Sequence, residues 1–370
     1  MTTSIDDEDD HEGELTGSHE HGAKQPRSNE PGARDEPTAG APLALAEGPP
    51  GGRIFSLDGR PAPGLYLVAW LLSLSGVAAL FVAISAQPSA GKVLLELAGI
   101  AGLGVGLSSA AGYQLLARAD RHPSLYRGPS PLILFGVVLA ASTLGKALLS
   151  ALGVADPALP LGFLIAVGII AVCYVASIWL FVVRGGALSW HDMGWPTVGA
   201  RRLAGALEAV VVAVMVMLPT TFVILLFGAL VAKVLGVQAP DPLPVRHDAA
   251  EALMVALAVA VVAPIGEEAF FRGFAMTAWL RDLGPRSALL RGAFFFAIVH
   301  ILNVSVEEGH AAEGFGQAIL EFVVILPLGT VLGWLFLRRG IVGSIAGHMT
   351  YNGLLLALVA VRAVVPDVRL

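Results

Sequence analysis

Long apolar runs separated by short polar segments fill the chain from about residue 65 to its end. A helix of about 20 apolar residues matches the thickness of the hydrocarbon core of a bilayer, and a helix satisfies its own backbone polar groups. The pattern therefore predicts an all-α fold, a polytopic transmembrane helical bundle of eight or nine spans. The predicted spans lie near residues 65–86, 93–117, 131–153, 160–183, 203–235, 250–270, 288–304, 316–337 and 341–363.

The composition agrees with a membrane protein, because 55% of the residues are hydrophobic and only 14% are charged. Residues 1–53 differ from the rest, since they hold 12 Asp and Glu against four Lys and Arg, a net charge of −8 within an overall −6. This segment has too few large apolar residues to offset the entropy of ordering, so we predict a disordered acidic tail. The remainder divides into N-terminal transmembrane helices at 54–189 and a C-terminal core at 190–370.

Basic residues recur on every second connection between the predicted spans, which indicates their cytoplasmic side. They include Arg53 and Arg60 before the first span, Arg118, Arg121 and Arg127 after the second, Arg184 after the fourth, Arg281 and Arg286 after the sixth, and Arg338 and Arg339 after the eighth. The N-terminus is therefore expected to be cytoplasmic. Nine spans would place the C-terminus outside, whereas Arg362 and Arg369 favour the cytoplasmic side, so its location stays open.

One predicted span ends in an unusual polar group, within the sequence VVAPIGEEAFFRGF at 261–274. Ionisable residues inside a membrane are costly and therefore candidates for function. Glu268 and Arg272 are four residues apart, so a helix would place them on one face as an ion pair. Glu267 would point about 100° away from that face and lack this partner. The segment alone is also compatible with a salt-bridged helix end.

Two later spans each carry a polar pair with the same four-residue spacing. Phe296 and His300 lie on one predicted helix, and His348 and Asn352 lie on the last one. Each pair alone could serve only to hydrogen-bond neighbouring helices. Three spans with polar groups at comparable depth instead predict one shared intramembrane site that includes Glu267.

The residue types at this site favour hydrolysis by an activated water molecule. No serine lies in a Gly-x-Ser-x-Gly context, and Cys173 lies in a different span without a surrounding motif. Glu267, assisted by His300, could take a proton from water. His348 and the Asn352 amide could then donate hydrogen bonds to the oxyanion of the tetrahedral intermediate.

A divalent metal such as zinc is the alternative, because two imidazoles, a carboxylate and an amide oxygen are plausible ligands. The ligand set would be Glu267, His300, His348 and Asn352. The chain has no His-Glu-x-x-His helix, and amide ligation is unusual for catalytic zinc. We therefore prefer a mechanism that requires no cofactor and keep the metal as an open alternative.

The three motifs together resemble the CPBP family, which comprises CAAX prenyl endopeptidases and bacteriocin-processing or abortive-infection proteins. The motifs are Glu267-Glu268-x-x-x-Arg272, Phe296-x-x-x-His300 and His348-x-x-x-Asn352, in this order. The resemblance covers about residues 190–363 and includes a loop at Gly194 similar to the one that precedes the family's core. It identifies the segment 190–370 as a catalytic, CPBP-like transmembrane core.

The resemblance implies an intramembrane endopeptidase, described in many members as a metalloendopeptidase. In such a site Glu267 would activate water together with His300, while His348 and Asn352 would form the oxyanion pocket. The supporting residues would be Glu268, Arg272 and Phe296.

The implied partners are the lipid bilayer and a peptide or protein substrate that is membrane-associated or lipidated, with no nucleic acid. Prenylation of the substrate is a family association that the residues themselves do not show. The implied location is a bacterial plasma membrane, with the site reached from the cytoplasmic side. The rival hypothesis is a non-catalytic membrane immunity or scaffold protein in which the same polar residues only fix helix packing. A proton-coupled transporter is a third alternative, disfavoured because no inverted repeat is visible.

Overall fold

The computed structural model describes residues 56–154, 156, 158–196, 200–237, 248–304 and 311–364. The predicted acidic tail at 1–53 lies outside them, as does most of the acidic segment at 305–313. The described residues form helices and connecting turns without a strand, which confirms the predicted all-α class. The helices all belong to one compact unit, Leu57–Leu370.

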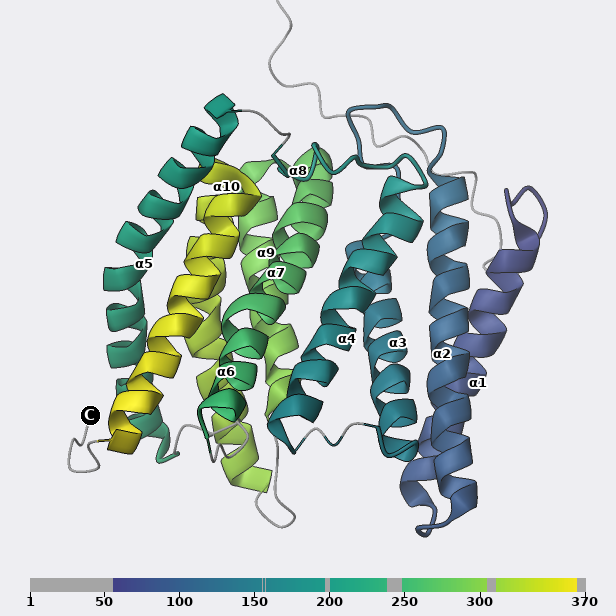
Figure 1. Ribbon diagram of the computed structural model, residues 1–370. Coiled ribbons are helices and arrows are strands. Elements are labelled where there is room, and N and C mark those ends of the chain that lie inside the picture. The colour runs from purple at the N-terminus through teal and green to yellow at the C-terminus, as the bar shows by residue number, and fades with distance from the viewer. Residues whose placement is uncertain are drawn as a thin grey trace, which may run out of the picture. The chain divides into compact units, whose positions relative to one another are not determined.

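Most of the described chain is helical (Figure 1). The elements in chain order are α1 (Pro63–Ser85), α2 (Ala90–Ala117), α3 (Pro131–Ala151), α4 (Pro160–Ile178), η1 (Trp179–Val183), α5 (Ala200–Leu235), α6 (Ala249–Leu257), η2 (Ala258–Val262), α7 (Ala263–Glu268), η3 (Ala269–Met276), α8 (Thr277–Leu283), α9 (Pro285–His300), η4 (Ile301–Asn303) and α10 (Ala311–Val364). The elements η1, η2 and η3 are π-helical, and η4 is a 3₁₀ turn.

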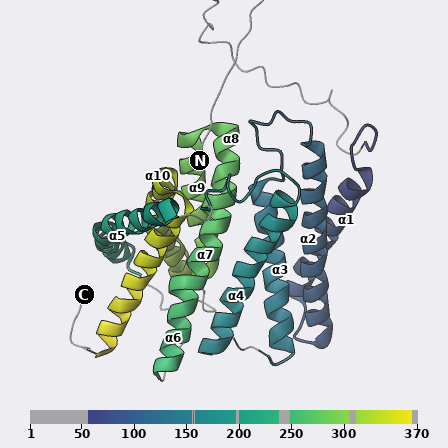
Figure 2. The same cartoon turned by 45° about the horizontal axis from the view of Figure 1, so that its top comes forward.

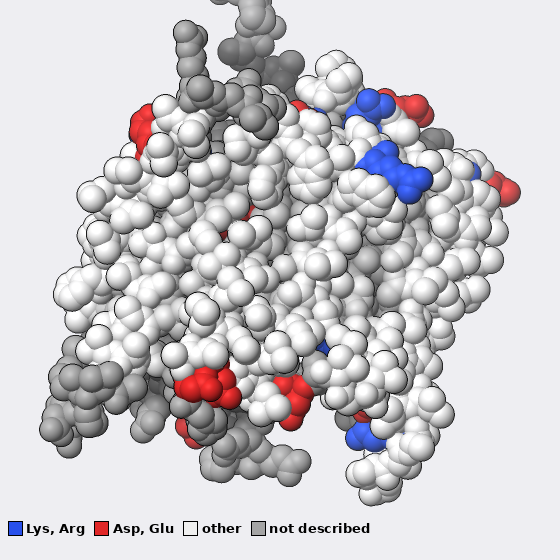
Figure 3. Space-filling model, in the orientation of Figure 1, with Lys and Arg blue, Asp and Glu red and all other residues white. Residues whose placement is uncertain are grey.

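Eight helical stretches in the described residues are long and apolar enough to cross a membrane. In Figure 3, the charged side chains lie mostly near the two ends of the helices, and a wide band between them is almost free of charge. An apolar band of this kind is stable in lipid and would be unfavourable in water. The chain is therefore an integral membrane protein.

Local sequence signals explain where several helices begin. Proline occupies the first turn of α1, α3, α4 and α9. It has no backbone N–H, and the N–H groups of a first turn have no partner within the helix, so nothing is lost there. The Ser89 hydroxyl accepts the backbone N–H of Lys92 at the start of α2. The Asp248 carboxylate accepts the N–H of Glu251 at the start of α6.

The sixth span is longer than the sequence pattern predicts. The elements α6, η2, α7, η3 and α8 follow one another without a break, so the helical stretch covers Ala249–Leu283 where the prediction ended at residue 270. The charged group around Glu268 interrupts the apolar run but not the helix. Both Glu268 and Arg272 are buried, and their charges pair inside the protein, so the helix can continue past them.

The helix α10 contains the last two predicted spans, joined at Gly340. This residue has φ 68° and ψ −167°, a conformation that is essentially restricted to glycine, and the helix breaks there. The halves at 311–339 and 341–364 fold back on each other. A Cβ added to Gly347 would lie 2.6 Å from the Leu335 Cδ1 atom, so the two halves approach closely. Within the described residues, the eight long stretches thus contain nine spans.

The spans are neighbours in chain order except for α5, which packs against α10. α1 packs against α2, α2 against α3 and α3 against α4, while α4 contacts α6 and α7, and α10 also contacts α9. Figures 1 and 2 show α5 beside α10, on the opposite side of the unit from α1. The aromatic core lies where α4, η3 and α9 meet, and its members include Tyr174, Phe270, Phe271, Phe295 and Phe296. This core holds the polar motifs in place.

The connection between η1 and α5 packs on the turn at Gly340. Gly194, with φ 81°, lies so close that an added Cβ would be 3.3 Å from the Ile341 backbone nitrogen. Arg281 of α8 pairs with Asp192 of this connection at 2.9 Å. Partial burial alone would raise the pKa of Asp192, but hydrogen bonds from Ser189 and the charge of Arg281 outweigh it and hold the pKa below its ordinary value.

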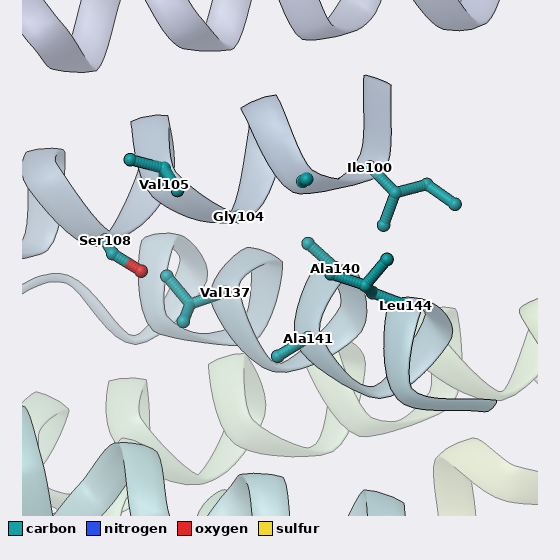
Figure 4. A pocket seen from close by; sticks show the side chains of 9 residues that line it. Ile100, Gly104, Val105, Ser108, Val137, Ala140, Ala141 and Leu144 are labelled. Carbon is teal, nitrogen blue, oxygen red and sulfur yellow. The ribbon is translucent and has the colours of Figure 1, made fainter. Parts of the chain in front are cut away.

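A separate apolar pocket of about 200 Å³ lies between α2 and α3 (Figure 4). It is lined by small and aliphatic residues such as Gly104, Ala140 and Leu144. None of the residues predicted to carry chemistry lines it.

We predict that Gly340→Ala destabilises the protein by about 1–3 kcal/mol, because alanine cannot adopt this backbone conformation without strain. The melting temperature in detergent should fall. Gly353→Ala is the matched control, because an added Cβ there meets no atom within 4 Å and the residue lies inside a helix. Equal melting temperatures for the two variants would contradict the role given to Gly340.

Candidate active site

The Glu268 carboxylate is completely buried and receives three hydrogen bonds. Its Oε1 atom accepts from Arg272 Nη1 at 2.7 Å and from His348 Nδ1 at 2.9 Å. Its Oε2 atom accepts from the Ser344 hydroxyl. A carboxyl group surrounded only by donors needs no proton of its own, so this environment fits the ionised form. The four-residue spacing correctly predicts the pair with Arg272.

Arg272 balances this charge and ties two further helices to the site. Its side chain is 2% exposed, and Nη2 donates to the backbone oxygen of Gly329 at 3.3 Å. Its guanidinium carbon lies 3.9 Å from the centre of the Phe296 ring. Gly329 permits this contact because an added Cβ would press against Ala293 and Phe296. The guanidinium thus connects η3, α9 and α10.

The two histidines turn the same ring atom toward Glu267. His300 Nδ1 donates to the backbone oxygen of Phe296 at 2.7 Å, and His348 Nδ1 donates to Glu268. Both partners are acceptors only, so the proton of each neutral imidazole belongs on Nδ1. The Nε2 atoms of His300 and His348 lie 3.7 Å and 3.9 Å from Glu267 Oε2. Three side chains from three spans therefore meet around one point.

Glu267 is held far less tightly than its neighbour Glu268. Its side chain is 23% exposed, whereas that of Glu268 is fully covered. Among the described residues, no donor forms a direct hydrogen bond with it. Its separations from the two Nε2 atoms are too long for direct hydrogen bonds but short enough for one shared water or ion. The geometry leaves Glu267 able to react while Glu268 is fixed.

Asn352 hydrogen-bonds to the sixth span at Val259 and not at the two glutamates. Its Nδ2 atom donates to the backbone oxygen of Val259 at 2.8 Å. In the π-helical element η2, the N–H of Ala263 bonds to Ala258, and the corresponding partner of Val259 would be Pro264, which has no N–H. Asn352 therefore satisfies a carbonyl that the helix leaves free, and it forms no hydrogen bond with Glu267.

The π-helical elements η2 and η3 lie directly before and after the short helix α7, which contains Glu267 and Glu268. Such elements shift the register of a helix and are frequent at functional sites. On the opposite side of α7, Gly266 allows α4 to approach, because an added Cβ would be 2.9 Å from Ala171 Cα. The carboxylates therefore sit on a locally adjusted helix that is packed against α4.

Sequence reasoning missed Ser344 and three backbone carbonyls, those of Val259, Phe296 and Gly329. Ser344 lies four residues before His348, so the spacing that identified the other pairs could have identified it. The carbonyls carry no sequence signal except Pro264, whose missing N–H marks the free carbonyl of Val259.

A divalent metal at this site would have Glu267, His300, His348 and Asn352 as its ligands. Within the described ranges, no three His, Cys, Asp or Glu side chains are grouped closely enough to hold a metal ion. Chemically, a carboxylate and two unprotonated imidazole nitrogens are donors that zinc accepts. Zinc therefore stays the open alternative to the preferred mechanism without a cofactor.

Residues 249–354 match a protein family described as type II CAAX prenyl endopeptidase Rce1-like. This segment contains all three polar motifs and is similar to that family, which confirms the predicted resemblance to CPBP intramembrane proteases. The match supports an intramembrane endopeptidase as the general class of the protein. No curated protein and no solved structure matches the chain.

We predict that Arg272→Met lowers stability by about 3–5 kcal/mol, because it leaves the buried Glu268 charge without its partner. Thermal unfolding in detergent measures the effect. The matched control is Arg281→Met, which breaks the partly exposed pair with Asp192 and should cost about 0–1 kcal/mol. A similar small loss for both variants would show that Glu268 does not depend on Arg272.

Proposed function

We propose that the chain is an intramembrane endopeptidase that hydrolyses a peptide bond with water activated by Glu267 and His300. The observation that carries the proposal is the approach of two histidine Nε2 atoms to within 3.7 Å and 3.9 Å of the Glu267 carboxylate. The family match at residues 249–354 supports the same reaction class.

In the proposed reaction, a water molecule donates a hydrogen bond to Glu267 and another to the unprotonated Nε2 of His300. Its oxygen attacks the peptide carbonyl carbon, and a proton passes to the carboxylate. The C–N bond of the tetrahedral intermediate then breaks, and this proton moves to the leaving amine. Glu267 thus carries the proton from the water molecule to the amine.

The oxyanion would be stabilised by His348 and Asn352. His348 donates through Nε2 only as the imidazolium ion, in which the Nδ1–H bond to Glu268 is retained. The Asn352 amide has two N–H groups, and one of them is bound to Val259. The second N–H is therefore the proposed donor to the intermediate.

The proposed substrate is a peptide or protein segment that is membrane-associated or lipidated and reaches the site from the cytoplasmic side. The proposed location is a bacterial plasma membrane with a cytoplasmic N-terminus. The basic residues on alternate connections support this orientation. The CAAX prenyl endopeptidase description of the matched family supports a lipidated substrate.

Replacement of Glu267 by Gln tests the assignment, because it preserves shape and removes the base. Cleavage of a reporter peptide by the purified protein in detergent should fall by about 10²–10⁴-fold, with little change in melting temperature. The matched control is Glu321→Gln, which removes a half-buried carboxylate of α10 that has no hydrogen-bond or ion-pair partner among the described residues. Unchanged cleavage by Glu267→Gln would refute the role assigned to Glu267, whereas a loss of stability with a preserved biological phenotype would favour the non-catalytic rival.

Chelation tests the proposed metal-free mechanism. Since water is activated by side chains alone, turnover should be unchanged after treatment with a zinc chelator and dialysis. Elemental analysis of the active protein should find less than one zinc per chain. Stoichiometric zinc whose removal stops turnover, and whose return restores it, would instead establish the metal alternative.

A further inference from the structure

Ser344 lies at the centre of the polar cluster, outside the three motifs. Its side chain is completely buried in the second half of α10, one turn before His348. Its hydroxyl contacts Glu268 Oε2, 76 residues away in the chain, and also lies 3.1 Å from the backbone oxygen of Leu332.

The single hydroxyl hydrogen of Ser344 can serve one of these two acceptors at a time. The Leu332 carbonyl lies inside a helix and can accept a backbone N–H from the following turn. The Glu268 carboxylate carries charge, and hydrogen bonds to charged acceptors are stronger than those between neutral groups. The hydrogen is therefore directed to Glu268.

This bond determines how the carboxylate can turn. Oε1 of Glu268 accepts both Arg272 and His348, and Ser344 alone donates to Oε2. Without the Ser344 bond, the carboxylate could rotate about its last single bond and release His348 Nδ1. The ring could then turn about its side-chain bonds and carry Nε2 away from Glu267 and from the oxyanion to which it is proposed to donate.

We infer that Ser344 is a positioning residue of the proposed reaction, which holds the Glu268 carboxylate so that His348 keeps Nε2 directed at Glu267. The inference rests on the proposed function. It distinguishes Ser344 from an ordinary buried serine such as Ser142 of α3, whose hydroxyl bonds only to the backbone oxygen of Leu139 within its own helix.

The test compares peptide cleavage by the full-length protein in detergent with its Ser344→Ala and Ser142→Ala variants. The two variants remove the same atom from equally buried sites, so packing losses are matched. Ser344→Ala should lower kcat roughly 10- to 100-fold, the range found when a residue that orients a site ligand is replaced, with little change in KM. Ser142→Ala should leave kcat unchanged.

A third variant, Ser344→Cys, keeps the shape and supplies a weaker donor, so its kcat should fall between those of wild type and Ser344→Ala. It also carries the test if Ser344→Ala fails to fold. Wild-type kcat for both Ser344 variants would overturn the inference, as would a loss in melting temperature with unchanged kcat for the folded enzyme. Those outcomes leave the proposed function standing, whereas full cleavage by Glu267→Gln would remove the proposed function itself.

Discussion

A negative charge on Glu268 in the interior of a membrane-spanning bundle is the constraint on which the rest of the site depends. An ionised carboxylate costs several kcal/mol to bury unless partners replace its water. Arg272 supplies the opposite charge from the same helix, and Ser344 and His348 supply donors from α10. Because these partners come from different spans, satisfaction of the charge also fixes how the spans pack. The helices around the site can therefore adopt few alternative arrangements.

The two adjacent carboxylates illustrate how one helix can separate a structural role from the reactive role that we propose. Glu268 faces the interior and is fully bonded, whereas Glu267 is turned toward the two Nε2 atoms and is partly exposed. The side chains that fix Glu268 also orient His348, and the backbone of Phe296 orients His300. The reactive side of the cluster thus obtains its geometry from groups that would not touch a substrate.

The sequence predicted the parts of this arrangement that depend on local spacing. The apolar runs identified the spanning helices, and the four-residue interval identified the ion pair of Glu268 with Arg272. The sixth span was predicted too short because a charged segment looks like a helix end when its partners on other helices are unknown. Contacts between spans, such as those of Ser344 and Gly329, depend on helix rotation and crossing, which hydrophobicity alone does not specify.

The bond between Asn352 and Val259 has a consequence for how mutational data on this protein should be interpreted. Pro264 leaves the Val259 carbonyl without a helical partner, and the asparagine side chain on the last span replaces it. Replacement of this asparagine would expose an unsatisfied carbonyl next to the segment that carries both glutamates. Alanine scanning at this position would therefore report a loss of backbone support together with any loss of chemistry. A replacement that keeps an amide could separate the two effects only if it still reached that carbonyl.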